Sequence, residues 1–531
     1  MDPGVSLAEL PVAVRRRVSN AISEPAVEAW PSTDFQLDNN DAELGANGEP
    51  AAPTDSQYLA VAVNQLRLAR PELSAGWPVW DWQIWFFGIV SIGLGLALFT
   101  FPRIALPAAL AILSLSFTSL AVLRLYCLWH GRNDRAGQGA ICRSLTPTED
   151  LPAYSVLVPL FREAGIARDL VSALQALDYP KTMLQILIVL EEADLATQHA
   201  VNQIGLPNHF EIIVVPAGAP QTKPRALNYA LLKARGAFIT VYDAEDVPEP
   251  DQLRRAIAAF ANGPSNLACV QARLNVYNAN KGWLTRQFTL EYTALFDWLL
   301  PALQALGLPV PLGGTSNHFR KAELVAVGGW DPFNVTEDAD LGIRLARQGY
   351  AVEVLASTTW EEAPATFRAW MCQRTRWLKG WMQTYLVHNR QPMRLWRDLG
   401  AWQFFGLQML MGGLLISALV HPWFYVFAGI SAWHGTLLHV PSSLDGQVLW
   451  GLGLFNLVTG YVTGLGLAVT AVARRGWPHL AKHALIVPVY WLMISFAAYR
   501  ALYQFASAPY FWEKTEHAAR SGQDCTRSAV S

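Results

Sequence analysis

The chain has 531 residues, of which 52% are hydrophobic and 21 are Trp. These fractions exceed those of ordinary soluble proteins, so we expect part of the chain to lie in lipid. The formal net charge is -2, and no run of Lys or Arg is longer than Arg15 to Arg17, which excludes a basic surface for nucleic acid. The five cysteines lack Cys-x-x-Cys spacing and predict neither a zinc site nor a disulfide framework.

Residues 1–76 are rich in Pro, Ala, Asn, Asp and Glu, which predicts a polar, largely disordered or loosely helical extension. Two uncharged stretches follow, 82–102 and 104–123, separated only by Arg103. Each has the roughly 20-residue length of a membrane-spanning helix, so we expect two transmembrane helices within 77–130. A buried soluble hairpin is the alternative. The Trp residues at the start of this segment favour the transmembrane interpretation, because Trp is enriched at membrane–water interfaces.

The positive-inside rule places the segment after this hairpin in the cytosol, because it carries Arg132, Arg135 and Arg143. We therefore expect a cytosolic domain over 131–398 and a second membrane region of three or four helices over 399–507, followed by a polar tail over 508–531. The total is five or six spans. Arg474 and Arg475 favour a cytosolic loop before the last span, whereas an even count puts both termini in the cytosol, and the sequence leaves the two criteria in conflict.

Within the polar domain, apolar strand-like runs alternate with helical patterns. The runs are 154–160, 184–190, 210–215 and 238–242. This alternation predicts an α/β fold of Rossmann-like type, with a mostly parallel sheet covered by helices on both faces. Ligands of such sheets bind beyond the carboxyl ends of the strands, so chemistry is expected there.

An acidic cluster directly follows the last of these runs. Asp243 and Glu245 can aim two carboxylates at one hard cation, which predicts a Mg²⁺ or Mn²⁺ ion shared with substrate phosphates. The alternative is a set of helix N-cap residues, since Asp and Glu favour the first turn of a helix. Asp246 is the natural candidate for such a cap.

A basic and aromatic segment occupies residues 373–377. The developing charge on a diphosphate leaving group needs guanidinium donors, and Arg374 and Arg376 are candidates. Sugar rings present flat C–H faces, which suit a large aromatic surface such as that of Trp377. The apolar residues around it repeat at helical spacing, so a purely structural amphipathic helix near 366–386, lying on the membrane surface, is the alternative. Both interpretations can hold together.

Taken together, the strand-end carboxylates, Thr336-Glu337-Asp338 and the Gln-x-x-Arg-Trp segment resemble the motifs of processive family 2 glycosyltransferases, the group of cellulose, hyaluronan and chitin synthases. The resemblance covers about 150–385 and extends to the flanking spans. It implies a GT-A-type nucleotide-sugar-binding domain. It also implies that Asp338 is the base that deprotonates the acceptor hydroxyl, with Glu337 and Thr336 shaping the site. Gln373 and Arg376 would lie near the diphosphate, and Trp377 against the acceptor sugar.

The same resemblance assigns residues on the donor side. Pro159 and Glu163 stand in the place of the family's uridine-contacting motif, and Glu191 and Glu192 replace its paired aspartates. Lys223 resembles its phosphate-side lysine at the start of a helix, where the dipole favours anions; an ordinary helix-start lysine is the alternative. Residues 313–317 are similar to the acceptor-side loop, or form a plain turn. Residues 511–517 resemble a gating segment, or serve as an interfacial anchor.

The sequence thus predicts a multi-pass membrane enzyme, in a bacterial inner membrane with its catalytic domain in the cytosol. It would transfer sugar from a UDP- or GDP-sugar donor to a growing glycan acceptor, with inversion, as a β-glycan synthase. Transfer of a single sugar to a lipid-linked acceptor is the nearest alternative. A transporter or receptor that kept the fold and lost the chemistry is the other. We expect the lipid bilayer, but no nucleic acid, among its partners.

Overall fold

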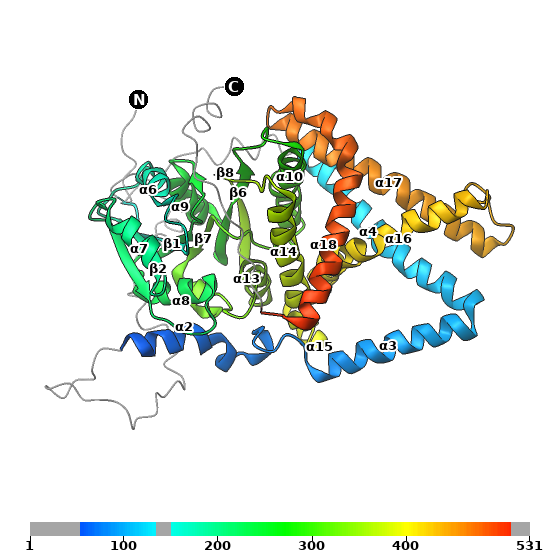
Figure 1. Cartoon of the computed structure of the whole chain (residues 1–531), viewed down its shortest axis with the longest axis horizontal. Helices are drawn as coiled ribbons and strands as arrows, with labels where there is room; N and C mark the ends of the chain where they lie inside the picture. The colour runs from blue at the N-terminus through cyan, green and yellow to red at the C-terminus, as the bar shows by residue number, and fades with distance from the viewer. Residues whose placement is uncertain (1–53, 134–149, 511–531) are drawn as a thin grey trace.

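The computed structural model describes residues 54–133 and 150–510. Figure 1 shows an α/β domain on one side and a group of long helices that extend away from it on the other. The predicted α/β fold, inserted between apolar helices, is confirmed.

A mixed sheet of eight strands, in the order β3-β2-β1-β4-β7-β6-β8-β5, organises the domain. The first four strands in this order are parallel, and their bounds are β3 Phe210–Val215, β2 Leu184–Glu191, β1 Tyr154–Leu160 and β4 Phe238–Val241. They match the four predicted runs to within one residue. The remaining strands are β7 Asn317–Arg320, β6 Leu267–Val276, β8 Ala351–Glu361 and β5 Val247–Pro248, with β7 antiparallel to both of its neighbours.

Helices cover both faces of the sheet because alternate strand residues point to opposite sides. On one face, Val156 and Ile188 pack with α6 Ala167–Gln175 and α9 Gln252–Asn262. On the other face, Leu157 packs with three helices, which are α8 Lys223–Lys233, α12 Lys321–Ala326 and α13 Glu337–Arg347. Strands β1, β2 and β4 are buried on both sides, which explains why their sequences read as continuous apolar runs, whereas the edge strand β3 is partly exposed.

The extension over 1–76, expected to be largely disordered or loosely helical, contains a packed helix in its last third. Residues 1–53 lie outside the described residues, but Asp55–Ala69 forms helix α2, with Ala62 and Leu66 buried against the domain. Thr54 caps this helix with Gln57. A short series of apolar residues at helical spacing packs against α8. The segment is polar on average, so its composition did not predict this helix.

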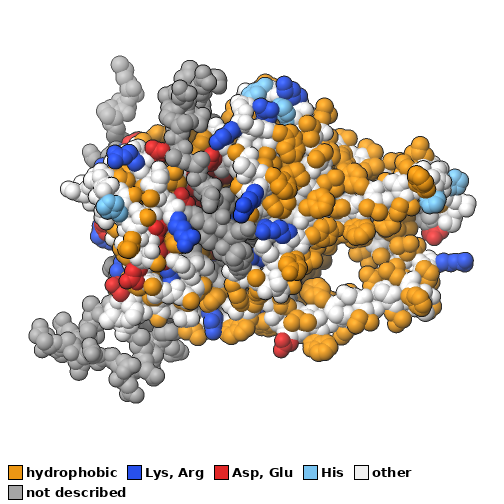
Figure 2. Space-filling view, viewed as in Figure 1, with side chains coloured by type: hydrophobic (Ala, Val, Ile, Leu, Met, Phe, Trp, Pro, Cys, Tyr) orange, Lys and Arg blue, Asp and Glu red, His pale blue; other side chains and the backbone are white. Residues whose placement is uncertain are grey.

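Five helical runs in the described part of the chain are long and apolar enough to cross a membrane. They are α3 Asp81–Thr100, the Pro102–His130 part of α4, Pro392–Trp433, α17 Leu444–Arg474, and Pro478–Ser507, which ends in α18 Val487–Ser507. Figure 2 shows exposed hydrophobic side chains concentrated over this half of the molecule. The first part of the expected second membrane region, residues 399–433, belongs to one helical run made of α15 Pro392–Leu407, η5 Gln408–Gly412 and α16 Gly413–Trp433, with a kink at Gly400.

Two domain helices join the sheet to the apolar helices. These are α10 Trp283–Ala294, continued by η4 Leu295–Leu299 and α11 Leu300–Ala305, and α14 Phe367–His388. One hydrophobic cluster contains side chains of α10, α14, α4, α17 and α18. The domain and the membrane helices are therefore one packed body at this boundary.

Candidate active site

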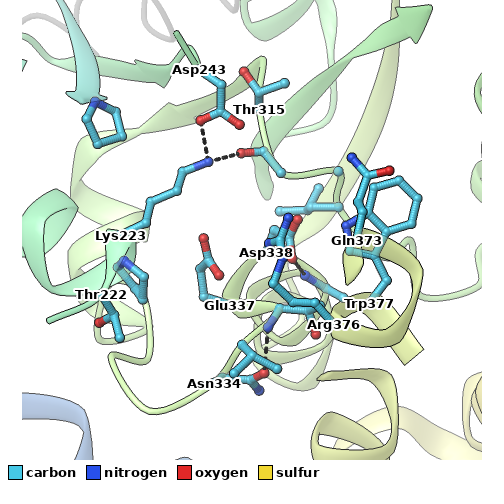
Figure 3. A pocket seen from close by; sticks show the side chains of 18 of the residues that line it. Thr222, Lys223, Asp243, Thr315, Asn334, Glu337, Asp338, Gln373, Arg376 and Trp377 are labelled. Carbon is cyan, nitrogen blue, oxygen red and sulfur yellow. Dashed lines mark hydrogen bonds and ion pairs between the residues drawn. The ribbon is translucent and has the colours of Figure 1, made fainter. Parts of the chain in front are cut away.

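A cavity of about 310 Å³ lies beyond the carboxyl ends of β1, β2 and β4, where the fold predicts ligands. Its lining brings together eleven of the thirteen candidate residues, which are Pro159, Glu163, Glu191, Lys223, Asp243, Glu245, Glu337, Asp338, Gln373, Arg376 and Trp377. These residues come from segments up to 218 positions apart in the chain. Figure 3 shows acidic and basic side chains facing one another across this space.

The turn after β4 presents Asp243 to the cavity and holds Asp246 behind it. The buried Asp246 carboxylate accepts a hydrogen bond from the backbone N–H of Asp243 at 2.8 Å and another from the Thr315 hydroxyl. Burial raises the pKa of Asp246 well above its usual range, and the charges of Asp243 and Glu245 raise it further. Asp246 therefore stabilises the turn, much as a cap would, while Asp243 and Glu245 face the cavity.

Lys223, at the first turn of α8, provides a positive charge opposite this turn. Its Nζ lies 2.5 Å from Oδ1 of Asp243 and donates to the Gly314 carbonyl at 2.7 Å (Figure 3). Burial alone would lower the pKa of Lys223, but the charges of Asp243 and Glu337 outweigh it and raise the pKa. The lysine is therefore a fixed cation at the centre of an acidic cavity.

The second acidic segment enters the cavity at the start of α13. Glu337 points to the side of Lys223, and Asp338 to the side of Gln373 and Arg376 (Figure 3). Burial, followed by the charge of Asp338, raises the pKa of Glu337 to about 7. Burial also raises the pKa of Asp338, whose Oδ1 accepts the Ala339 N–H at 2.8 Å. A carboxylate with a raised pKa, next to fixed cations, is suited to receive a proton.

Helix α14 supplies the third group of residues. Gln373, Arg376 and Trp377 lie on its cavity-facing side, as a spacing of three and four residues requires. Oε1 of Gln373 is buried and has no hydrogen-bond partner among the described residues, so a polar ligand group fits there. Further along, Gly380 packs directly on the Thr336 side chain, because a Cβ at this glycine would lie 2.3 Å from Oγ1 of Thr336.

A family model described as Glycosyl transferase family group 2 matches residues 238–503, half of the chain. The chain belongs to this family. It is 28% identical over 339 residues to a probable glycosyltransferase, YdaM, of Bacillus subtilis, covering 62% of this chain and 78% of that protein. It is 28% identical to a beta-monoglucosyldiacylglycerol synthase of Synechocystis (57% and 66% covered), and 26% identical to glucomannan 4-beta-mannosyltransferase 2 of Arabidopsis thaliana (48% and 49% covered). The protein is a membrane glycosyltransferase.

Two candidate residues of this glycosyltransferase lie outside the cavity. Arg374 does not line the cavity and forms two hydrogen bonds with Glu291 of α10, at 2.8 and 2.5 Å. Its guanidinium also lies 4.8 Å from the Trp377 ring. Glu192 accepts the Ala217 N–H at 2.7 Å on the surface. Helix geometry explains the first case, since residues 374 and 376 are too far apart around α14 to share one side.

The neighbouring candidate Glu191 lines the cavity but already has a strong partner. Its carboxylate pairs with the fully buried guanidinium of Arg225, one turn into α8. This ion pair fixes α8 against the end of β2. Glu191 therefore positions the helix that carries Lys223, in addition to any contact with a ligand.

Sequence reasoning missed several lining residues. Glu361 is the last residue of β8 and Glu362 follows it, and the apolar residues of that strand were the available signal. Tyr292 lies on α10 and stacks on Trp377, with ring centroids 6.0 Å apart and an angle of 18°. Tyr510, just after α18, also reaches the cavity. No local pattern marks Tyr292 or Tyr510, because only tertiary packing brings them there. Residues 511–517, the expected gating segment, lie outside the described residues.

One wall of the cavity is apolar. It is formed by Leu274, Leu295, Phe296, Leu300 and Leu312. This wall adjoins the acidic segment, since a Cβ at Gly313 would touch Leu274 and Phe296 at 3.1 Å, and one at Gly314 would lie 3.2 Å from Oδ2 of Asp338. Phe296 and Leu300 belong to the same cluster as Leu123 of α4. The apolar wall therefore connects the site to a membrane helix.

Proposed function

We propose that this protein is an inverting transferase that moves a sugar from a UDP- or GDP-sugar to a hydroxyl of a growing β-glycan. The observation that supports it is a cavity holding two adjacent carboxylates, the buried Glu337 and the partly buried Asp338, on which the charges of Lys223 and Arg376 act. One placed base is what a direct displacement needs. The α/β domain would then bind its donor in the GT-A manner, on the cytosolic side of a bacterial inner membrane.

In the proposed reaction, the acceptor hydroxyl lies between Asp338 and the Trp377 ring. Its oxygen forms a bond to the anomeric carbon as its proton passes to the Asp338 carboxylate. The bond from the anomeric carbon to the nucleoside diphosphate breaks at the same time, and Lys223 and Arg376 hold the charge that develops on the leaving oxygens. An α-linked donor therefore gives a β-linked product.

The turn after β4 fits a divalent cation. Among the described residues no three His, Cys, Asp or Glu side chains are arranged to hold a metal ion by themselves. Asp243 and Glu245 nonetheless face the cavity together, and the ion pair of Asp243 with Lys223 Nζ at 2.5 Å supports a role for this carboxylate in holding positive charge. These two carboxylates would hold Mg²⁺ or Mn²⁺, with diphosphate oxygens completing its shell, and the ion would neutralise the diphosphate.

A second candidate function is transfer of one sugar to a lipid acceptor. The apolar wall beside Asp338 favours it, because aliphatic side chains give no hydrogen bonds to glycan hydroxyls but pack well against an acyl chain. The likeness to a beta-monoglucosyldiacylglycerol synthase supports the same candidate, whereas the likeness to a glucomannan mannosyltransferase supports the polymer.

The test is to supply each common UDP- and GDP-sugar, radiolabelled in the sugar, to the purified protein in lipid nanodiscs. Release of nucleoside diphosphate identifies the donor, and size separation identifies the product. Long β-linked product supports the proposal. A single labelled sugar on a lipid establishes the second candidate. A folded protein that releases no diphosphate from any donor, with or without Mg²⁺ or Mn²⁺, would show that the chemistry has been lost.

A further inference from the structure

Helix α18, with the short helix η6 Pro478–Ile486 before it, qualifies as a membrane span by length and composition. Its first end, however, is bound to the α/β domain. Gln287 of α10 donates to the His483 carbonyl at 2.8 Å, and the Tyr490 hydroxyl donates to Glu291 of α10 at 2.8 Å. The beginning of α18 therefore lies on the side of the catalytic domain.

The other end of α18 is bound to the same domain. Lys379 of α14 donates to the Ala508 carbonyl at 3.4 Å. Tyr510 donates to the Gly76 carbonyl at 2.6 Å, packs against Phe333 and lines the active-site cavity. The 21 residues of α18 extend about 31 Å, which is the thickness of a hydrocarbon core. A helix that crossed the bilayer would have its two ends on opposite sides of the membrane, so both ends could not contact one domain.

Between its ends, α18 lies along α14, as Figure 1 shows. Trp370, near the start of α14, packs on Tyr490 with ring centroids 5.3 Å apart, and Met382, near the end of α14, shares a cluster with Ala501. Helix α14 carries the polar residues of the cavity, so it belongs outside the hydrocarbon core. A helix that accompanies α14 along its length lies at the same boundary.

The neighbouring spans support this placement. Helix α18 contacts α4 and α17 through Trp491. The Trp491 ring lies 5.6 Å from the guanidinium of Arg124 on α4, and a Cβ at Gly464 on α17 would lie 2.8 Å from it. From Arg124 back to Pro102, α4 extends about 33 Å, and from Gly464 back to Leu444, α17 extends about 30 Å. The part of each helix that extends beyond α18 is therefore about as long as the hydrocarbon core is thick.

We propose that α18 lies in the plane of the membrane, at the boundary facing the catalytic domain, and that residues 54–133 and 150–510 cross the bilayer four times. The crossings are α3, α4, the run from α15 to α16, and α17. The partner of the exposed side of α18 is the acyl region of the adjacent leaflet, which accepts its exposed Val489, Phe496 and Leu502. Four crossings put Arg474 and the described end residues 54 and 510 on the domain side, which removes the conflict between the charge rule and an even count.

This topology is tested by cysteine labelling with a membrane-impermeant maleimide in intact cells, compared with permeabilised cells. Cys127 and Cys269 are buried and stay in place, whereas Cys142, Cys372 and Cys525 are replaced by Ser. One probe is then introduced at a time, as Leu195→Cys on the catalytic domain, Leu438→Cys between α16 and α17, His479→Cys before α18, or the restored Cys525. Leu195 and Leu438 are well exposed, at 72% and 84%.

We expect His479→Cys and Cys525 to behave like Leu195→Cys, and Leu438→Cys alone to react from the opposite side. Reaction of Cys525 together with Leu438→Cys would overturn the proposal, because α18 would then cross. Reaction of His479→Cys from that side would overturn it too. The unsubstituted protein is a second test that does not depend on the replacements, since it should stay unlabelled in intact cells. None of these results depends on enzymatic activity, so they stand apart from the proposed function.

Discussion

Glu337 and Asp338 are adjacent, but only one can be the base of the proposed reaction. Asp338→Asn keeps the size and hydrogen-bonding capacity of the side chain and removes proton acceptance, so kcat should fall by about 10²- to 10⁴-fold. Affinity for the nucleoside diphosphate, measured by calorimetry, should change little. Glu337→Gln is the matched variant and should retain more activity. If Glu337→Gln is instead the more damaging change, the base is Glu337.

Glu337 also gives a pH-dependent stability that can be measured without substrate. Burial and the charge of Asp338 raise its pKa from 4.5 to about 7 in the folded protein, so the folded state holds the proton more tightly than the unfolded state. The stability that this proton contributes is present below pH 4.5 and is lost as the pH rises through 7. Glu337→Gln should therefore raise Tm more at pH 8 than at pH 5, corresponding to at most about 3 kcal/mol.

The control for this effect is Glu192→Gln, a change of the same kind outside the cavity. Its Tm, measured at the same two pH values, is the reference with which the Glu337→Gln variant is compared. Equal shifts for Glu337→Gln would contradict the raised pKa.

Asp243 allows a test of the metal site. Asp243→Asn should abolish turnover while the protein still elutes as a folded species, because removing the ion from a diphosphate costs several kcal/mol of transition-state stabilisation. A chelator should inactivate the wild-type protein, and added Mn²⁺ or Mg²⁺ should restore the wild-type protein but not the variant. Asp169→Asn, on α6 away from the cavity, should leave turnover unchanged. Full activity in excess chelator would argue against a metal.

Helix α14 carries Trp377, whose ring stacks on Tyr292 and contacts the guanidinium of Arg374. If the Trp377 ring supports the terminal sugar of the acceptor, Trp377→Ala should lower acceptor occupancy roughly ten- to a hundredfold, in line with the about 1–3 kcal/mol of an aromatic platform. Polymer formation should stop. Hydrolysis of the donor by water, which needs no acceptor, should continue.

The control is Trp396→Ala, because Trp396 packs on Phe404 and Phe405 of α15. It should leave polymer formation close to that of the wild type. Size separation of labelled product decides the outcome: long product from Trp377→Ala would show that the ring is no platform.

The elements of the sheet could be predicted because burial on both faces produces runs such as 184–190 that no other local structure explains. The position of the acidic turn after β4 followed from the same pattern. Helical spacing separates Arg374 from Arg376, but which of the two faces the cavity could not be predicted without a structure. Both are arginines on one amphipathic helix, and only tertiary packing shows that Arg374 pairs with Glu291 of α10.

At the scale of the whole molecule, helix α2 tests whether a helix outside the α/β domain depends on packing against it. Leu66 is 3% exposed against the domain, whereas Leu68 is 58% exposed. Leu66→Ala leaves a gap next to Gly328. A buried Leu→Ala change costs about 2–5 kcal/mol, and this range is an upper limit here because a surface helix can move to fill the gap. Hydrogen exchange over 55–69 should accelerate in Leu66→Ala and stay unchanged in Leu68→Ala. Equal exchange in both would mean that α2 does not depend on this contact.

The large-scale arrangement was the least accessible to sequence reasoning. Hydropathy predicts that a segment such as 484–499 prefers lipid, but it gives no orientation. A helix that crosses the bilayer and one that lies in its plane can have the same composition. The bonds of Tyr490 and Tyr510 to the domain distinguish them, and these bonds connect residues more than a hundred positions apart.

The contact between Gly380 and Thr336 has a consequence for the evolution of the family. The two residues belong to different motifs, one at the acidic segment and one on the helix that carries Trp377, and there is no room for a side chain between them. A larger residue at position 380 is tolerated only if position 336 becomes smaller in the same lineage. Among homologues, the two positions should therefore vary as a pair, and exchanging one motif between relatives without the other should yield inactive hybrids.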